Sequence, residues 1–209
     1  MPKQFLLLKD KPILQWTLEA FMPSDAVHEI CLVVPENQLD ETKRDFSNRY
    51  RISSIVAGGE TRQDSVRNGF EKIPRCDVVL VHDAVRPFIT AAMIERVIEG
   101  AVREGGAVLG LPQRETLKDV GEDRAIVRTV NRETIWSVQT PQGFRYAIFE
   151  EALRRAKEDH FVGTDEAMLV ERLGKKIVMV EGSPLNIKIT LPEDLILAEG
   201  IVDARRNRV

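Results

Sequence analysis

Long apolar runs are absent from the 209-residue sequence. No stretch approaches the roughly 18 consecutive apolar residues of a membrane-spanning helix, and the run Leu6–Leu8 is too short for the core of a signal peptide. An excess of one charge is also lacking, because 30 basic residues face 33 acidic residues and the net charge is −3. This balance favours neither a nucleic-acid nor a membrane partner, so a bound anion must meet a local cluster of positive side chains.

Cysteine is scarce, and several nucleotide and catalytic motifs are missing. Cys31 and Cys76 are the two cysteines, they form no CxxC pair, and Cys31 sits in an apolar run. This usage predicts core or surface thiols of a cytoplasmic protein rather than a disulfide framework. The sequence contains no Walker loop and no GxGxxG, which argues against ordinary ATPase and dinucleotide sites. It also contains no Ser-His-Asp arrangement and no metal-ligand spacing.

Apolar runs of strand length alternate with helical patterns along most of the chain. The predicted strands cover 29–34, 52–56, 77–84, 106–112 and 175–182. The predicted helices cover 12–21, 35–50, 61–73, 90–104, 144–160, 164–174 and 191–209. This alternation predicts one α/β domain over residues 1–209, with a mostly parallel sheet between two helical layers.

Residues 112–136 interrupt the alternation. Short alternating pieces flank the turn signal GEDR, and apart from Val120, Ile126 and Val130 the segment is polar on both sides. We interpret it as a protruding β-hairpin arm inserted in the domain. Because its own domain covers it poorly, we expect it to pair with a second subunit; the alternative is a mobile surface hairpin.

The segment VLVHDAVRPF places polar side chains directly after an apolar strand. In open parallel sheets, ligands bind outside the carboxyl ends of the strands. Asp83 could hold a divalent cation there, and Arg86 could bind a phosphate through two hydrogen bonds. The alternative is an Asp–Arg ion pair at the surface. His82 is interpreted as a packed neighbour of this site rather than a general base.

A second candidate lies in AGGETRQDSVRNGF. Gly58 and Gly59 allow a ligand to approach the backbone closely, and the amides from Thr61 onward could face an anion or a base. The alternative is a simple strand–helix turn capped by Thr61.

Three further polar residues stand out by their surroundings. Lys3 lies in PKQF, just before the first helix. Lys188 lies in an otherwise apolar segment, 185–190, which we interpret as a strand, and a buried lysine there would need an anionic partner. Thr140 is predicted to end a short strand before Pro141, where its hydroxyl could donate to a phosphate or only shape the turn.

Taken in order, the motifs PKQFL, GGETRQDSV, VHDAVRPF, TPQGF, TDEA and NIKITLPEDL resemble 2-C-methyl-D-erythritol 4-phosphate cytidylyltransferases, the CTP-using enzymes of the non-mevalonate isoprenoid pathway. The resemblance covers essentially the whole chain. It implies a Rossmann-like nucleotidyltransferase sheet with a dimerisation arm. It also implies that a phosphate oxygen of methylerythritol phosphate attacks the α-phosphorus of CTP, with pyrophosphate leaving and a magnesium ion at the phosphates.

The resemblance also implies roles for residues that match the family motifs. Lys3 would stabilise charge on the α-phosphoryl group, and Lys188 and Arg132 would hold the methylerythritol phosphate. The cytosine end of CTP would be recognised by Gly58, Gly59, Glu60 and Ser65. Asp83 and Ala84 would lie near the ribose, the substrate hydroxyls and the metal, and the acceptor pocket would be completed by Arg86, Thr116 and Thr140.

The family implies a homodimer whose arms reach the partner's site. Because Thr116 and Arg132 lie on or beside the arm, both would act in the partner subunit. Family members also carry a strand and a Gly/Arg-rich loop before the PKQ lysine, whereas Met1 directly precedes Pro2 here. We therefore expect weaker CTP binding than in a chain extended by about 20 residues of strand and loop. The alternatives are that the sequence starts late or that it is a truncated chain without its phosphate cradle.

Two other functions stay open from the sequence. A ribitol 5-phosphate-type cytidylyltransferase would share the fold and CTP site and differ in the acceptor pocket. A truncated, non-catalytic dimeric scaffold is the second alternative.

Overall fold

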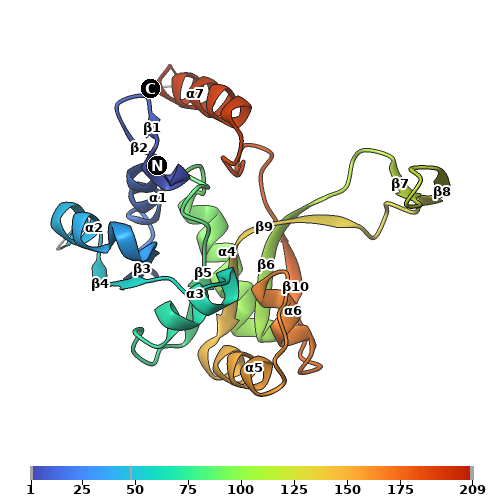
Figure 1. Cartoon of the computed structure of the whole chain (residues 1–209), viewed down its shortest axis with the longest axis horizontal. Coiled ribbons are helices and arrows are strands. Elements are labelled where there is room, and N and C mark those ends of the chain that lie inside the picture. Colours follow the sequence, from blue (N-terminus) through green and yellow to red (C-terminus); the bar gives the residue numbers. More distant parts are fainter. Residues whose placement is uncertain (1, 48, 208–209) are drawn as a thin grey trace.

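A four-stranded sheet in the order β10–β6–β9–β5 forms the centre of the computed structural model, which describes residues 2–47 and 49–207 (Figure 1). The strands are β5 (Val78–Val81), β6 (Gly106–Pro112), β9 (Trp136–Arg145) and β10 (Val178–Glu181). β10 runs parallel to β6, whereas β9 runs antiparallel to both β6 and β5. The α/β class is confirmed, and the sheet is mixed because β9 enters it in the opposite direction.

A second, parallel pair of strands lies beside this sheet and consists of β3 (Ile30–Val34) and β4 (Ile52–Ala57). A cleft of about 1420 Å³ separates β3 from β5, and every residue of both strands lines it. Side chains alternate between the two faces of a strand, so lining by consecutive residues means that the edges of β3 and β5 face this cleft. Gly58 and Asp83, which follow the carboxyl ends of β4 and β5, also line the cleft.

Helices cover both faces of the four-stranded sheet. The seven α-helices among the described residues are α1 (Ile13–Phe21), α2 (Leu39–Phe46), α3 (Arg62–Phe70), α4 (Ala91–Glu104), α5 (Tyr146–Glu158), α6 (Glu166–Glu171) and α7 (Pro192–Arg206). Ala107 and Leu109 of β6 pack with residues of α4, whereas Val108 packs with residues of α5 and α6. Consecutive residues of one strand thus enter opposite cores, which gives the predicted three layers. None of the helices in the described part of the chain has the length and apolarity needed to cross a membrane.

Short elements complete the fold. They are two 3₁₀ turns, η1 (Lys3–Phe5) and η2 (Glu36–Gln38), and a small hairpin formed by β1 (Leu7–Leu8) and β2 (Lys11–Pro12). The helix predicted over 35–50 is thus divided into η2 and α2. Part of that prediction falls on Asn48, outside the described residues, as does the end of the last predicted helix at 208–209.

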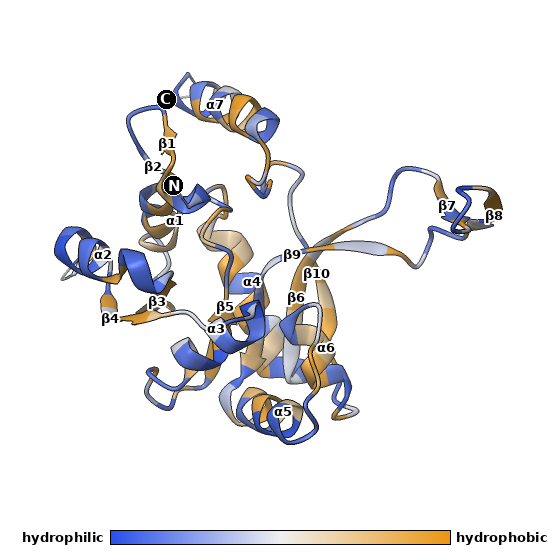
Figure 2. Ribbon diagram, viewed as in Figure 1, coloured by the Kyte–Doolittle hydropathy of each residue, from blue (hydrophilic) through white to orange (hydrophobic). Residues whose placement is uncertain are grey.

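The predicted hairpin within 112–136 is present and projects from the body of the molecule (Figure 1). Its strands are β7 (Leu117–Val120) and β8 (Ile126–Val130), which pair antiparallel around a turn closed by the Gly121 amide and the Ala125 carbonyl at 3.0 Å. Apolar residues colour the outer part of this arm in Figure 2. Ile126 and Val127 are 65% and 67% exposed, so within a single chain the arm leaves apolar surface uncovered.

Two local predictions are wrong. Thr140 does not end a short strand, because β9 continues through Pro141. Pro141 lies between Val138 and Gln142, where β9 makes no pairs with β6, so the sheet loses no hydrogen bond through the missing proline N–H. The segment 185–190 is not a strand. It turns where the Asn186 amide donates to the Ser183 carbonyl, and beyond that turn the Ile189 amide donates to the Val85 carbonyl, a backbone hydrogen bond that is not part of a strand ladder.

Candidate active site

Asp83 is the centre of a cluster of charged side chains at the carboxyl end of β5. Its Oδ2 lies 3.0 Å from Lys188 Nζ and 3.4 Å from Arg86 Nε, and its Oδ1 accepts a hydrogen bond from Arg62 Nη2 at 3.2 Å. The side chains of Asp83 and Arg86 are each 11% exposed, whereas that of Lys188 is 42% exposed. Three cations therefore surround one carboxylate, and the cluster offers spare positive charge to an anionic ligand.

The charge state of Asp83 follows from its neighbours. Burial alone would raise the pKa of this carboxyl, but Lys188 and Arg62 outweigh burial and hold the pKa below its usual range. Asp83 is thus ionised at neutral pH. Burial lowers the pKa of Arg86, against the opposing effect of Asp83. The guanidinium nevertheless stays protonated at neutral pH.

His82 and Thr140 form a hydrogen-bonded chain behind the cluster. The Asp83 amide donates to Thr140 Oγ1 at 3.0 Å, and Thr140 Oγ1 lies 3.1 Å from His82 Nδ1. His82 Nε2 lies 3.1 Å from the Arg86 carbonyl, which can only accept, so Nε2 carries the proton and Nδ1 accepts from the threonine hydroxyl. Burial lowers the pKa of His82 to about 4, which fits this neutral tautomer. The chain fixes the backbone of 82–86, as expected for a packed histidine.

The glycine turn after β4 forms the second part of the site. The Gly59 amide donates to Ser65 Oγ at 3.0 Å, and a Cβ added at Gly59 would lie 2.3 Å from Asp64 Cβ. Thr61 and Asp64 cap α3 reciprocally, with the Asp64 amide donating to Thr61 Oγ1 at 3.0 Å. A side chain at Gly59 would therefore collide with the first turn of α3.

The structure brings most of the predicted site residues to one end of the cleft. The cleft is lined there by Gly58, Gly59, Glu60, Ser65, Asp83 and Ala84. Lys188, Arg86 and Thr140 join them through contacts with Asp83. Lys188 belongs to this group, but it is not a buried strand residue. Its segment is irregular and its side chain is partly exposed.

Three predicted residues form no hydrogen bond or ion pair with Asp83 within this chain. Thr116 and Arg132 are exposed on the arm, where Arg132 Nη1 donates to the Arg114 carbonyl. Lys3 is exposed in η1. Hydrogen bonds from the Leu191 and Thr190 amides lower the pKa of Asp194, and the charge of Lys3 adds to this effect, so Lys3 lies near the start of α7.

Sequence reasoning missed three residues of the site. Glu166 accepts a hydrogen bond from Arg62. Arg62 lies in the motif GGETRQDSV and begins α3, and Glu166 lies in the motif TDEA and begins α6. Asn186 is fully buried; its backbone carbonyl accepts from Arg86 Nη1 at 2.9 Å, and its side-chain Nδ2 donates to the Thr140 carbonyl at 3.1 Å. The residues come from separate motifs, and only the folded chain shows which of them meet.

The donor set is compatible with one hard cation held jointly with substrate phosphates. Among residues 2–47 and 49–207, no group of three or more His, Cys, Asp or Glu could bind a metal by itself. Mg²⁺ commonly uses one or two carboxylates and completes its shell with phosphate oxygens and water. Asp83, a carboxylate that lines the cleft beside the Gly58–Gly59 turn, fits that pattern.

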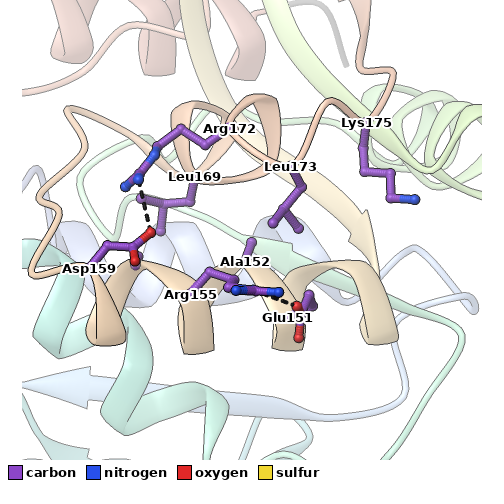
Figure 3. Close-up of a pocket in the computed structure, with 9 residues that line it drawn as sticks. Glu151, Ala152, Arg155, Asp159, Leu169, Arg172, Leu173 and Lys175 are labelled. Atoms are coloured by element: carbon purple, nitrogen blue, oxygen red, sulfur yellow. Dashed lines mark hydrogen bonds and ion pairs between the residues drawn. The ribbon is translucent and has the colours of Figure 1, made fainter.

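A smaller pocket of about 460 Å³ lies between α5 and α6, away from this cluster (Figure 3). Four of its charged residues form ion pairs, Arg155 with Glu151 at 3.0 Å and Arg172 with Asp159 at 2.9 Å. These are exposed ion pairs of the kind that contribute little energy. The pocket is therefore a surface groove and not a second candidate site.

Comparison with known proteins identifies a family that this chain matches over nearly its whole length. A family model described as 2-C-methyl-D-erythritol 4-phosphate cytidylyltransferase matches residues 1–204. A curated protein of that name from Syntrophus aciditrophicus (strain SB) is 43% identical over 212 residues, which cover 100% of this chain and 91% of the relative. One from Alkaliphilus metalliredigens (strain QYMF) is 41% identical, with 98% and 87% covered.

Solved structures agree with the sequence relatives. The crystal structure of 2-C-methyl-D-erythritol 4-phosphate cytidylyltransferase from Thermus thermophilus superposes with a TM-score of 0.84 and is 37% identical. That match covers 97% of this chain and 94% of the other. The structure of the Francisella tularensis protein of the same name gives 0.82 and 32% identity, covering 96% and 93%.

Proposed function

The chain belongs to the 2-C-methyl-D-erythritol 4-phosphate cytidylyltransferase family, and we propose that its Asp83 cluster is where a cytidylyl group passes from CTP to methylerythritol phosphate. The observation that carries this assignment is the cluster itself. Lys188, Arg86 and Arg62 meet one carboxylate that lines a large cleft, and the Gly58–Gly59 turn lines the same cleft. An acceptor phosphate and a nucleotide both need such a concentration of positive charge.

In the proposed reaction, a phosphate oxygen of methylerythritol phosphate attacks the α-phosphorus of CTP and pyrophosphate leaves. The product is 4-diphosphocytidyl-2-C-methyl-D-erythritol. Such chemistry depends on positioning and on stabilising the charge of the transferring group. Lys188 fits the task of holding the acceptor phosphate, because its ammonium is already fixed 3.0 Å from Asp83 and still partly exposed. Arg86 and Thr140 support the acceptor pocket, and Lys3 is assigned to the α-phosphoryl group.

We assign the nucleotide base to the glycine turn. Gly58 and Gly59 leave the backbone open to a planar ring, and Glu60 and Ser65 lie at the same turn. Asp83 and Ala84 face the cleft a short way along it and would contact the ribose. Asp83 would also hold a magnesium ion together with the phosphates. When bound, that ion would neutralise charge on the phosphates during transfer.

We further propose that the protein works as a homodimer joined through residues 112–136. The arm exposes Ile126 and Val127 at its tip and contributes Thr116 and Arg132, which are distant from the Asp83 cluster of their own chain. A partner that covers the arm would bury its apolar surface, and Arg132 would complete the partner's acceptor pocket. Residues 1–209 are then one catalytic domain with the arm as an insertion. The two free cysteines suit a cytoplasmic location.

Product formation with CTP, Mg²⁺ and each of two acceptors tests the assignment. We expect the cytidine diphosphate product with methylerythritol phosphate, and little or none with ribitol 5-phosphate. Preference for ribitol 5-phosphate would move the chain to the other acceptor class. No turnover with either acceptor, from a protein that remains dimeric, would favour the non-catalytic scaffold. The Lys188→Ala variant should lower product formation. Lys176→Ala is its matched control, because Lys176 pairs with Glu104 on the surface.

A further inference from the structure

A buried carboxylate reaches the Asp83 cluster through one arginine. Glu166, the first residue of α6, is 2% exposed, and its Oε1 accepts a hydrogen bond from Arg62 Nη1. The other terminal nitrogen of Arg62 donates to Asp83 Oδ1 at 3.2 Å. The guanidinium thus bridges two carboxylates that lie 83 positions apart in the sequence, and three separate elements meet at it.

The packing of α6 does not account for Glu166. An apolar side chain would fill the same space without the cost of burying a charge, and the second oxygen, Oε2, has no hydrogen-bond partner among the described residues. Burial raises the pKa of Glu166 against the opposing effect of Arg62. The contact with Arg62 is therefore what the buried carboxylate provides.

We propose that Glu166 and Arg62 are positioning residues for Asp83, an inference that rests on the proposed function. Glu166 holds one edge of the guanidinium, so the other edge is fixed toward Asp83 Oδ1. That contact leaves Oδ2 facing Lys188 and Arg86 and stops the carboxylate from rotating between the two orientations. Glu166 also balances the charge of Arg62, which keeps Arg62 on Asp83 when a phosphate arrives.

The first experiment needs no turnover. Arginine side-chain NMR of the chain at neutral pH measures rotation about the Nε–Cζ bond of each guanidinium. We expect rotation in Arg62 to be at least about tenfold slower than in Arg67, which lies on the same helix and, within residues 2–47 and 49–207, pairs with Asp64 alone at 2.7 Å. Glu166→Gln should remove that difference. Equal rotation of the two guanidinium groups in the unsubstituted chain would overturn the proposal.

The second experiment is a double-mutant cycle on product formation. Glu166→Gln and Arg62→Lys should each lower kcat by about tenfold, with KM for CTP changed less than about threefold. The double variant should lose no more than the worse single variant, because both act through one contact. Multiplied losses, near a hundredfold, would refute the shared path. Arg67→Lys is the matched control and should leave kcat unchanged.

The two experiments fail separately. An unsubstituted chain without turnover would overturn the proposed function. Slow rotation at Arg62 would still support the positioning of Asp83 by Glu166 and Arg62. Normal turnover of the unsubstituted chain, with multiplied kcat losses in the double variant and free rotation at Arg62, would leave the proposed function standing and remove Glu166 and Arg62 from it. Circular dichroism and urea unfolding of each variant establish that the fold is retained, and Glu166→Asp, which keeps the charge, should recover part of the lost kcat.

Discussion

Replacing His82 by asparagine should make the protein less sensitive to acid. In the folded chain, burial lowers the pKa of His82 from 6.5 to about 4. Between these two values the unfolded chain binds a proton at this residue and the folded chain does not. The free energy of unfolding therefore falls as the pH is lowered through this window, and the fall levels off below about pH 4.

The size of the effect follows from the two pKa values. A pKa difference of one unit corresponds to about 1.4 kcal/mol, so His82 can remove at most about 3 kcal/mol of stability on complete acidification. Asparagine does not titrate in this pH range and keeps an oxygen near the place of Nδ1, where the Thr140 hydroxyl can still donate. It loses the bond to the Arg86 carbonyl. That loss costs about 1 kcal/mol and does not depend on pH.

Urea unfolding at about pH 7 and about pH 4.5 measures both effects. We expect the His82→Asn variant to be less stable than the parent near neutrality, and to lose about 2 kcal/mol less than the parent on acidification. Other groups titrate in the window, with Asp83 destabilising the fold in acid and Glu166 acting in the opposite direction, but both are present in the two proteins. His28→Asn, at an exposed position, is the control. An equal acid loss in parent and variant would refute the buried, neutral imidazole.

Further predictions concern the site and the arm. Lys188→Ala should lower turnover by a factor on the order of 10² or more with the fold intact, whereas Lys176→Ala should not; near-normal turnover would remove Lys188 from its role. Thr140→Val should cost about 2 kcal/mol in urea unfolding, because its hydroxyl serves a buried amide and an imidazole, while Thr140→Ser should recover most of that cost. Gly59→Ala should weaken CTP binding in calorimetric titration, since its Cβ would lie 2.3 Å from a neighbouring side-chain carbon; unchanged affinity would separate this turn from the base. Mixed dimers of Arg132→Ala and Lys188→Ala subunits should recover activity toward one intact site per dimer, and proven subunit exchange without recovery would refute action across the interface.

The sequence predicts best what depends on local pattern. The apolar run 106–112 becomes β6, with its first five residues buried, because both of its faces are covered by helices. A helix is predicted to begin at residue 90, and Thr90 caps α4, since its hydroxyl accepts from the Met93 amide. Asp83 and Arg86 meet because they are three residues apart in one turn, and the adjacent strand ends bring the glycine turn to the same cleft.

The failures arise where long-range packing overrides local pattern. β9 contains Gln139, Pro141, Gln142 and Gly143, so its sequence does not look like a central strand, yet six consecutive residues from Gln139 to Phe144 are buried. The side chain of Gln142 forms its hydrogen bonds with groups distant in sequence. It donates to Asp165 at 2.8 Å and accepts from the Ala167 amide at 2.9 Å. A polar residue with such partners belongs in a core, but no periodicity indicates them in advance.

The same limit separates the site residues that were predicted from those that were not. A lone lysine in an apolar segment attracts attention, so Lys188 was identified even though its predicted strand is absent. Arg62 and Glu166 are an ordinary arginine and glutamate at the starts of helices, where charged residues are common and usually solvated. Only the folded chain shows that the glutamate is 2% exposed and that the arginine joins it to Asp83. Burial of a charge therefore carries the functional signal at these two positions, and burial is decided by the tertiary structure.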